Sequence, residues 1–187
     1  MKVLAFAASN SKNSINRQLA LYTASLVKNA TVETLDINDY EMPLFSEERE
    51  KQLGIPPKAK IFFNKLAATD AIIVSFAEHN GTYTAAFKNL YDWTSRINKA
   101  VFGHKPTLFL ATSPGSSGAK SVLATAKNSA AFMGANLKGI VSIPSFFDNF
   151  DIENNRFMNP IFETKIKLAV SQLVNTAVAT PIITQVQ

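Results

Sequence analysis

Short apolar runs alternate with segments of helical periodicity along the whole 187-residue chain. The first run is apolar without alternation, as in a strand that is buried on both faces. Strands that alternate with helices form a parallel sheet, because right-handed crossovers place the helices on both of its faces. The pattern therefore predicts an α/β fold around five parallel strands. The expected strands are Val3–Ala7, Thr31–Leu35, Ala71–Phe76, Thr107–Ala111 and Leu137–Ile143.

The segments between these runs have the spacing of amphipathic helices. The first starts after Ser14, which we expect to act as its N-cap. The others are expected at Lys58–Ala68, Thr84–Ile97, Lys120–Met133 and Pro160–Val178. In the Lys58–Ala68 helix, Ile61 and Leu66 are expected to point inward. The polar connector 43–57 carries prolines at its ends and one expected solvated helical turn, at 47–51.

Composition removes several classes of function. The chain has no Cys, so a disulfide framework and a thiolate metal site are both impossible. With only two histidines, a His-built metal site is not expected. The net charge of +5 comes from scattered Lys and Arg without a basic stripe, which favours small phosphorylated anions over nucleic acid. No apolar run approaches the ~20 residues that span a bilayer, so we expect a cytoplasmic protein without a membrane partner.

Ligands of parallel α/β sheets bind beyond the carboxyl ends of the strands. The loops that follow the first, third and fourth strands read SNSKNS, AEHNGTYT and TSPGSSGAK. The first loop joins a strand to a helix N-terminus, where free N–H groups and the helix dipole favour an anion. It contains neither G-x-G-x-x-G nor G-x-x-x-x-G-K-[ST], so its hydroxyls and amides suit one terminal monophosphate. The alternative is an ordinary polar turn with a helix cap.

Three motifs together resemble a known family. S-x-x-x-x-S-x-N follows the first strand, A-E-x-N-G follows the third, and F-K-N-x-x-D-W-x-S-R lies on the next helix. They resemble the NAD(P)H-dependent FMN reductase-like family of the flavodoxin-like superfamily, over nearly the whole chain. The resemblance implies one flavodoxin-like domain over residues 1–187, a three-layer sandwich with a five-stranded parallel sheet in the order 2-1-3-4-5. It also implies FMN as cofactor and NAD(P)H as hydride donor.

The resemblance also assigns roles to the three loops. The residues that match the family's FMN phosphate loop are Ser9, Ser11, Ser14, Ile15 and Asn16. Those that match the loop along the isoalloxazine ring are Ala77, Glu78, His79, Asn80 and Gly81. Those that match the loop closing over the other side of the flavin are Ser113, Pro114, Gly115, Ser116 and Gly118.

This chain departs from the family pattern at three of these places. Ala8 stands where the family usually has Gly, and Ser11 where Arg is common, with Lys12 next to it as an alternative charge. His79 replaces a Tyr that commonly flanks the ring. It is either a pH-dependent group beside the flavin or an exposed residue that only shapes the rim of the site.

Several aromatic and acidic residues allow more than one interpretation. Trp93 is expected in the core or at an interface. The cluster Phe146, Phe147 and Phe150 is expected to wall a site, to cap a dimer or to fill the end of the core. Glu78 is expected to act through its backbone, because hydride transfer to a flavin needs position rather than a protein acid.

The resemblance predicts an NAD(P)H-dependent flavin oxidoreductase. Its acceptor would be a small molecule: a quinone, an azo compound, a metal oxyanion, free flavin or oxygen. The implied assembly is a homodimer or a homotetramer. Two alternatives are a flavodoxin-type electron carrier that does not oxidise NAD(P)H, and a flavin-free dimeric binding module. The carrier is disfavoured because such carriers are typically acidic, whereas this chain has a pI near 9.4.

Overall fold

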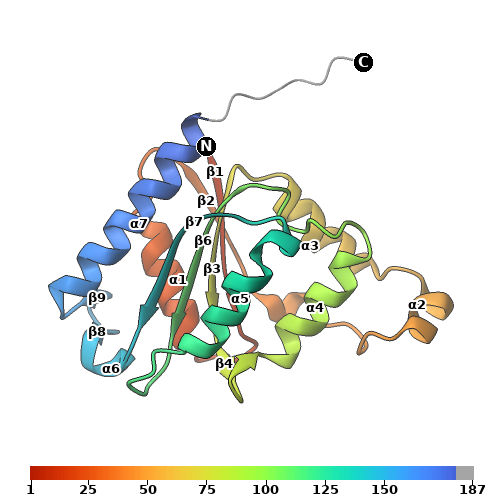
Figure 1. The fold of residues 1–187 in the computed structure, drawn as a ribbon, viewed down its shortest axis with the longest axis horizontal. Coiled ribbons are helices and arrows are strands. Elements are labelled where there is room, and N and C mark those ends of the chain that lie inside the picture. Colours follow the sequence, from red (N-terminus) through yellow and green to blue (C-terminus); the bar gives the residue numbers. More distant parts are fainter. Residues whose placement is uncertain (180–187) are drawn as a thin grey trace.

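A computed structural model describes residues 1–179 and contains one five-stranded parallel sheet (Figure 1). Its strand order, β2-β1-β3-β6-β7, is the predicted order 2-1-3-4-5, and the flavodoxin-like fold class is confirmed. The register is regular at the centre, where Phe6 lies level with Leu35 on one side and Val74 on the other. The sheet strands are β1 (Lys2–Ala8), β2 (Thr31–Leu35), β3 (Ala71–Phe76), β6 (Pro106–Thr112) and β7 (Asn136–Ile143).

Helices cover both faces of this sheet and make a three-layer structure (Figure 1). The face packed by α3, α4 and α5 buries alternate strand residues such as Leu4 and Val74, and the face packed by α1 and α7 buries the others, such as Val3 and Ile73. The period of two along each strand therefore divides the core into two halves. The helices are α1 (Ile15–Ser25), α3 (Pro57–Ala67), α4 (Ala85–Ser95), α5 (Lys120–Met133) and α7 (Pro160–Ala179).

The prediction for Ile61 is wrong. Its side chain is 51% exposed, whereas Leu66 is buried as expected. The buried face of α3 is formed by Ala59, Phe62 and Leu66, whose spacings of three and four residues follow one side of a helix. Ile61 lies about 100° around the helix from Phe62 and so leaves the core.

Short elements, which the apolar pattern does not reveal, complete the chain. A hairpin of β4 (Glu78–His79) and β5 (Thr82–Tyr83) turns at Asn80 and Gly81, both with positive φ, as a type I′ turn requires. The connector contains the 3₁₀ helix η1 (Ile37–Tyr40) and the helix α2 (Glu47–Leu53), which extends the expected helical turn. The others are α6 (Phe146–Asn149) and a hairpin of β8 (Phe150–Asp151) and β9 (Arg156–Phe157).

Helix α2 projects from the body of the molecule (Figure 1). It is capped by Ser46 but buries none of its own side chains. Arg96 of α4 holds it through an ion pair with Glu50, with an Nε–Oε1 distance of 2.9 Å. Within residues 1–179, no helix is both long and apolar enough to cross a membrane. The same residues contain no group of three or more acidic, His or Cys side chains arranged to hold a metal ion.

Candidate functional site

A cleft of about 300 Å³ lies where β1, β3 and β6 end. The three polar loops that the sequence singles out come together around it, although about 60 residues separate the first from the second and about 30 separate the second from the third. Its lining comprises Ser9, Ser11, Asn13, Ser14, Ile15, Asn16, Ala77, Glu78, His79, Thr112, Ser113, Pro114 and Phe147. The carboxyl edge of the sheet is thus the place where this fold assembles a site.

Most of the predicted site residues belong to this lining. Five others lie on the same loops but outside it: Asn80, Gly81, Gly115, Ser116 and Gly118. Asn13 and Thr112 also line the cleft, although neither was among the predicted site residues. Asn13 stands inside the polar loop and Thr112 follows an expected strand, so both carry a local signal. Phe147 belongs to the cluster for which a place in the wall of a site was one of three interpretations, and nothing in the sequence separates it from its buried neighbours.

The first loop has the features of an anion site. Ser14 is the N-cap of α1, and its Oγ accepts a hydrogen bond from the Arg17 backbone N–H at 3.2 Å. Within residues 1–179 the backbone N–H groups of Ile15 and Asn16 donate to no other group. These are the first N–H groups of a helix, which have no partner inside it and which the helix dipole makes attractive to an anion. The Ser14 hydroxyl hydrogen adds a further donor.

Asn16 ties this loop to the sheet. Its side chain is buried and donates from Nδ2 to the Thr112 carbonyl at 3.0 Å. Its Oδ1 accepts from the Ser75 hydroxyl at 2.8 Å and from the Thr112 N–H at 3.0 Å. One side chain therefore joins the start of α1 to β3 and to β6. The geometry gives Asn16 a positioning role in addition to its backbone N–H.

Glu78 joins the other two loops. Its Oε2 accepts a hydrogen bond from the Val122 backbone N–H in the first turn of α5, at 2.8 Å. Helix α5 has no cap of its own, because the N-cap position is Ala119, with φ +55° and no side-chain hydrogen bond. The carboxylate thus supplies the cap from a neighbouring loop. The expectation that only the backbone of Glu78 matters misses this contact.

The walls of the cleft are a hairpin and an aromatic side chain. His79 is exposed on the hairpin, as in the interpretation that it shapes the rim. Two of the three interpretations of the phenylalanine cluster, a filled core end and a site wall, apply to different members. Phe146 and Phe150 fill the core with their rings stacked at 5.0 Å, whereas Phe147 is 56% exposed and lines the cleft. The cleft thus offers apolar walls above a polar loop.

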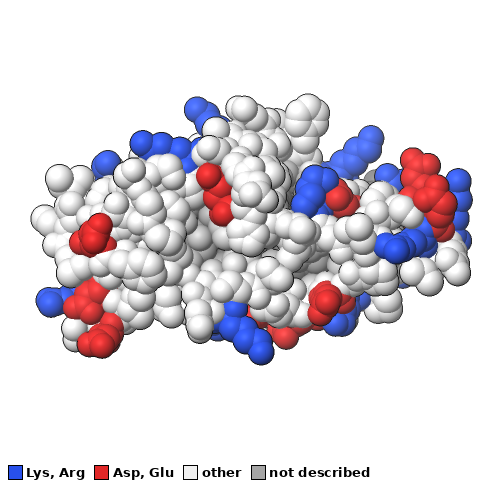
Figure 2. Space-filling view, turned by 90° about the horizontal axis from the view of Figure 1, so that it is seen from below, with Lys and Arg blue, Asp and Glu red and all other residues white. Residues whose placement is uncertain are grey.

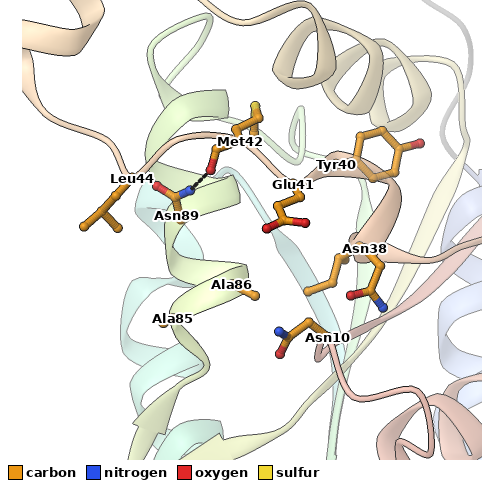
Figure 3. A pocket seen from close by; sticks show the side chains of 10 residues that line it. Asn10, Asn38, Tyr40, Glu41, Met42, Leu44, Ala85, Ala86 and Asn89 are labelled. Atoms are coloured by element: carbon orange, nitrogen blue, oxygen red, sulfur yellow. Dashed lines mark hydrogen bonds between the residues drawn. The ribbon is translucent and has the colours of Figure 1, made fainter.

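A second cleft, of about 310 Å³, lies on the other side of the first loop (Figure 3). Asn10 lines it from that loop, and Ala85 and Ala86 line it from the start of α4. The segment 37–44 closes it on the far side. Burial raises the pKa of the Tyr40 phenol in this wall, so the phenol keeps its proton at neutral pH.

The F-K-N-x-x-D-W motif holds the wall of this second cleft in place. Asn89 donates from Nδ2 to the Met42 carbonyl at 3.1 Å, drawn in Figure 3, and its Oδ1 accepts from the Phe45 N–H at 2.8 Å. Trp93, which is buried in the core as expected, donates from Nε1 to the Pro43 carbonyl at 2.7 Å. Side chains of α4 therefore hold the connector in place through hydrogen bonds to the backbone of the connector.

Charged side chains are sparse on the face that carries the carboxyl ends of the strands. Figure 2 shows this face with its middle largely free of Lys, Arg, Asp and Glu. Charges of both signs gather at the end of the molecule where α2 projects. Binding in the first cleft thus depends on hydroxyl and backbone donors rather than on a cluster of cations.

Comparison with known proteins agrees with this geometry. The sequence profile of the family described as NADPH-dependent FMN reductase matches residues 1–148, which include all three loops. The chain belongs to this family. This membership confirms the family resemblance that the sequence motifs indicated. It also confirms the prediction of an oxidoreductase and of FMN and NAD(P)H as the cofactors that the family uses.

Two relatives whose names state an enzymatic activity have sequence identities of 30% and 31% to this chain. An NAD(P)H-dependent FMN reductase of Pseudomonas aeruginosa is 31% identical over 62% of this chain and 61% of its own length. A 2-hydroxy-1,4-benzoquinone reductase of a Burkholderia species is 30% identical over 63% of each chain. The chain thus aligns with less than two thirds of these reductases. An uncharacterized Mycoplasma pneumoniae protein is 32% identical over 81% of this chain and 92% of its own length.

A solved structure shares the fold over almost the full length. It is FerB, a flavoenzyme NAD(P)H:(acceptor) oxidoreductase of Paracoccus denitrificans, with a TM-score of 0.75 and 20% identity. The similarity covers 95% of this chain and 97% of FerB. At this identity the comparison supports the fold alone.

Proposed function

We propose that this chain is a single-domain, cytoplasmic, FMN-dependent NAD(P)H oxidoreductase whose electron acceptor is a quinone or another small molecule. FMN would lie in the first cleft, with its phosphate at the first loop and its ring between the second and third loops. The FMN reductase family and the names of the quinone and flavin reductase relatives support this proposal.

One observation carries it: the first turn of α1 presents unpartnered N–H groups and the Ser14 hydroxyl to a cleft at the carboxyl edge of the sheet. Such a helix start is suited to a phosphate. The residues present fit FMN, because a phosphate-suited loop lies beside apolar walls from Ala77, Pro114 and Phe147. The polar side of the lining would fix the phosphate, and the apolar walls would contact the ring.

The chain contributes binding and orientation. FMN, when bound, would supply the redox chemistry, namely hydride transfer from the nicotinamide and electron transfer to the acceptor. Asn16 and Glu78 keep the three loops at fixed positions through their hydrogen bonds to β3, β6 and α5. Since the Glu78 carboxylate is engaged in a helix cap, a role as general acid or base is not proposed for it.

We propose a homodimer, or a dimer of dimers, as the assembly. The exposed apolar side chains of Leu44 and Leu53 support it, as does the absence of buried side chains on α2. A second copy packed against this projecting helix would remove those side chains from water. The proposed dimer would also explain why the ion pair between Arg96 and Glu50 fixes α2 to the end of α4.

Steady-state oxidation of NADH and NADPH tests the proposed activity. The purified protein is assayed with saturating FMN and with benzoquinone, an azo dye, chromate or oxygen as acceptor. We expect turnover that depends on FMN and is fastest with one acceptor. FMN binding without nucleotide oxidation would favour the electron carrier, and absence of FMN binding would favour the flavin-free module.

A further inference from the structure

The second cleft is built from different chemistry than the first. Its lining contains the carboxylate of Glu41 and the carboxamides of Asn10 and Asn38, and it contains no Lys or Arg. Met42 and Ala86 give it apolar surface. A cleft with a carboxylate and no cation disfavours phosphate and favours a neutral ligand that has hydrogen-bond donors.

Two polar side chains in this cleft are available to a ligand. Both residues are exposed to solvent, and within residues 1–179 neither Glu41 nor Asn10 makes a side-chain hydrogen bond or an ion pair, so both keep their hydrogen-bonding capacity for a ligand. In Figure 3 the Glu41 carboxylate points into the space between α4 and η1. Asn89 is different, since its carboxamide is already engaged with the connector.

The position of the cleft suits the remote half of a long ligand. Ser9 and Ser11 line the first cleft, and Asn10, between them, lines the second. The two clefts are therefore one loop apart. A nicotinamide dinucleotide that places its nicotinamide ring at a flavin in the first cleft has an adenosine end that must lie elsewhere on the same edge of the sheet.

We propose that the second cleft binds the adenosine end of the nicotinamide cofactor, and that Glu41 selects NADH against NADPH. This inference rests on the proposed function. A carboxamide pairs with the edge of adenine through one donor and one acceptor. A carboxylate accepts a hydrogen bond from the ribose 2′-hydroxyl, the recognition used in other nucleotide-binding α/β folds. The 2′-phosphate of NADPH would meet the same carboxylate with like charge and no nearby cation in the lining.

Calorimetric titration of the FMN-saturated protein tests this inference without turnover. The probes are adenosine 5′-monophosphate and adenosine 2′,5′-bisphosphate, which differ only in the 2′-phosphate. We expect the monophosphate to bind at least about tenfold more tightly, because the 2′-phosphate would lie beside the Glu41 carboxylate, which has the same sign of charge. Glu41→Arg should reverse this preference, and Glu41→Gln should reduce it.

Two further variants locate the binding. Ala85→Phe places a large side chain at the exposed start of α4, on the edge of the cleft, and should weaken both nucleotides. Glu153→Gln makes the same charge change as Glu41→Gln at an exposed turn between β8 and β9, and should change neither. In steady-state turnover, the ratio of kcat/KM for NADH to kcat/KM for NADPH should be highest in the wild-type protein, lower in Glu41→Gln and lowest in Glu41→Arg. The differences should appear in KM rather than in kcat.

Equal or tighter binding of the bisphosphate to the wild-type protein would overturn the inference. So would 5′-monophosphate binding that Ala85→Phe leaves unchanged. If the discrimination is found but neither dinucleotide is oxidised, the cleft assignment is supported and the proposed function fails. If both dinucleotides are oxidised equally well and Glu41→Arg has no effect on either assay, the proposed function stands and this inference fails.

Discussion

At the scale of single residues, Asn16 shows how one side chain determines the shape of a site. Its carboxamide joins the Ser75 hydroxyl on β3 to the backbone of Thr112, the last residue of β6. The partners of Asn16 are the Ser75 hydroxyl and both backbone groups of Thr112, and all of these residues are buried. A buried polar group that loses its partner costs about 1–3 kcal/mol.

Asn16→Ala should therefore lower the free energy of unfolding by about 2–4 kcal/mol, as measured by urea denaturation. Asn13→Ala is the control. Asn13 lies on the same loop, is exposed, and makes no side-chain hydrogen bond within residues 1–179, so its replacement should cost less than about 0.5 kcal/mol. Equal stability of the Asn16 variant and the wild-type protein would show that the carboxamide is not needed to hold the strands.

At the scale of elements, two helices depend on side chains from elsewhere in the chain. Glu78 caps the N-terminus of α5. Lys105, just before β6, donates from Nζ to the Leu66 carbonyl at 2.9 Å, and also to the carbonyls of Ala67 and Thr69, at the C-terminus of α3. Burial lowers the pKa of the Lys105 ammonium, whereas the helix dipole favours a positive charge at this end. Both contacts join a helix end to a neighbouring loop or strand.

Glu78→Ala should destabilise the protein by about 1–2 kcal/mol, the usual cost of losing a helix cap. Glu78→Gln keeps an oxygen acceptor for the Val122 N–H and should recover most of that loss. Urea denaturation measures both. A glutamine variant as unstable as the alanine variant would mean that the charge matters rather than the hydrogen bond.

Lys105→Met removes three hydrogen bonds and keeps most of the apolar stem. We expect a loss of about 1–3 kcal/mol in the free energy of unfolding, since the last carbonyls of α3 lose their partner. Lys127→Met, on the exposed side of α5, should be neutral within about 0.5 kcal/mol. Similar losses in the two variants would contradict the capping role.

The elements that the sequence predicted well are those with a local signal. Ala71–Phe76 is apolar except for Ser75 and forms β3 with the expected bounds, and Ser14 is the expected cap. The prediction that Ile61 points inward was wrong because the apolar character of one residue does not determine which side of the helix faces the core. The contacts of Asn16 with Thr112 and of Glu78 with Val122 join residues 96 and 44 positions apart, so no local pattern contains them.

At the scale of the whole molecule, the two clefts lie on either side of the first loop, and helix α2 projects beyond α4 (Figure 1). Helix α4 connects the second cleft with α2. Its first residues line the second cleft, and Asn89, Trp93 and Arg96 hold the connector and α2. The family's F-K-N-x-x-D-W motif thus has a structural explanation in this chain: it fixes the connector that closes the second cleft and carries the proposed dimer surface.

Light scattering after size exclusion tests the proposed dimer. The wild-type protein should have two or four times the chain mass of 20.4 kDa. Leu53→Glu on α2 should raise the dissociation constant at least about tenfold, because a charge would replace an interface side chain. Leu168→Glu, equally exposed on α7 at the opposite face of the sheet, is the control and should not. A monomer at all concentrations, or dissociation only in the Leu168 variant, would contradict the proposal.

The most direct test of the flavin site is a pair of fluorescence titrations with FMN and with riboflavin, which differ only in the phosphate. If the first turn of α1 binds that phosphate, the wild-type protein should bind FMN at least about 100-fold more tightly than riboflavin. Ser14→Ala should lower this ratio while leaving riboflavin affinity nearly unchanged. Equal affinity for the two flavins, or a ratio that Ser14→Ala does not alter, would show that the phosphate does not lie at this loop.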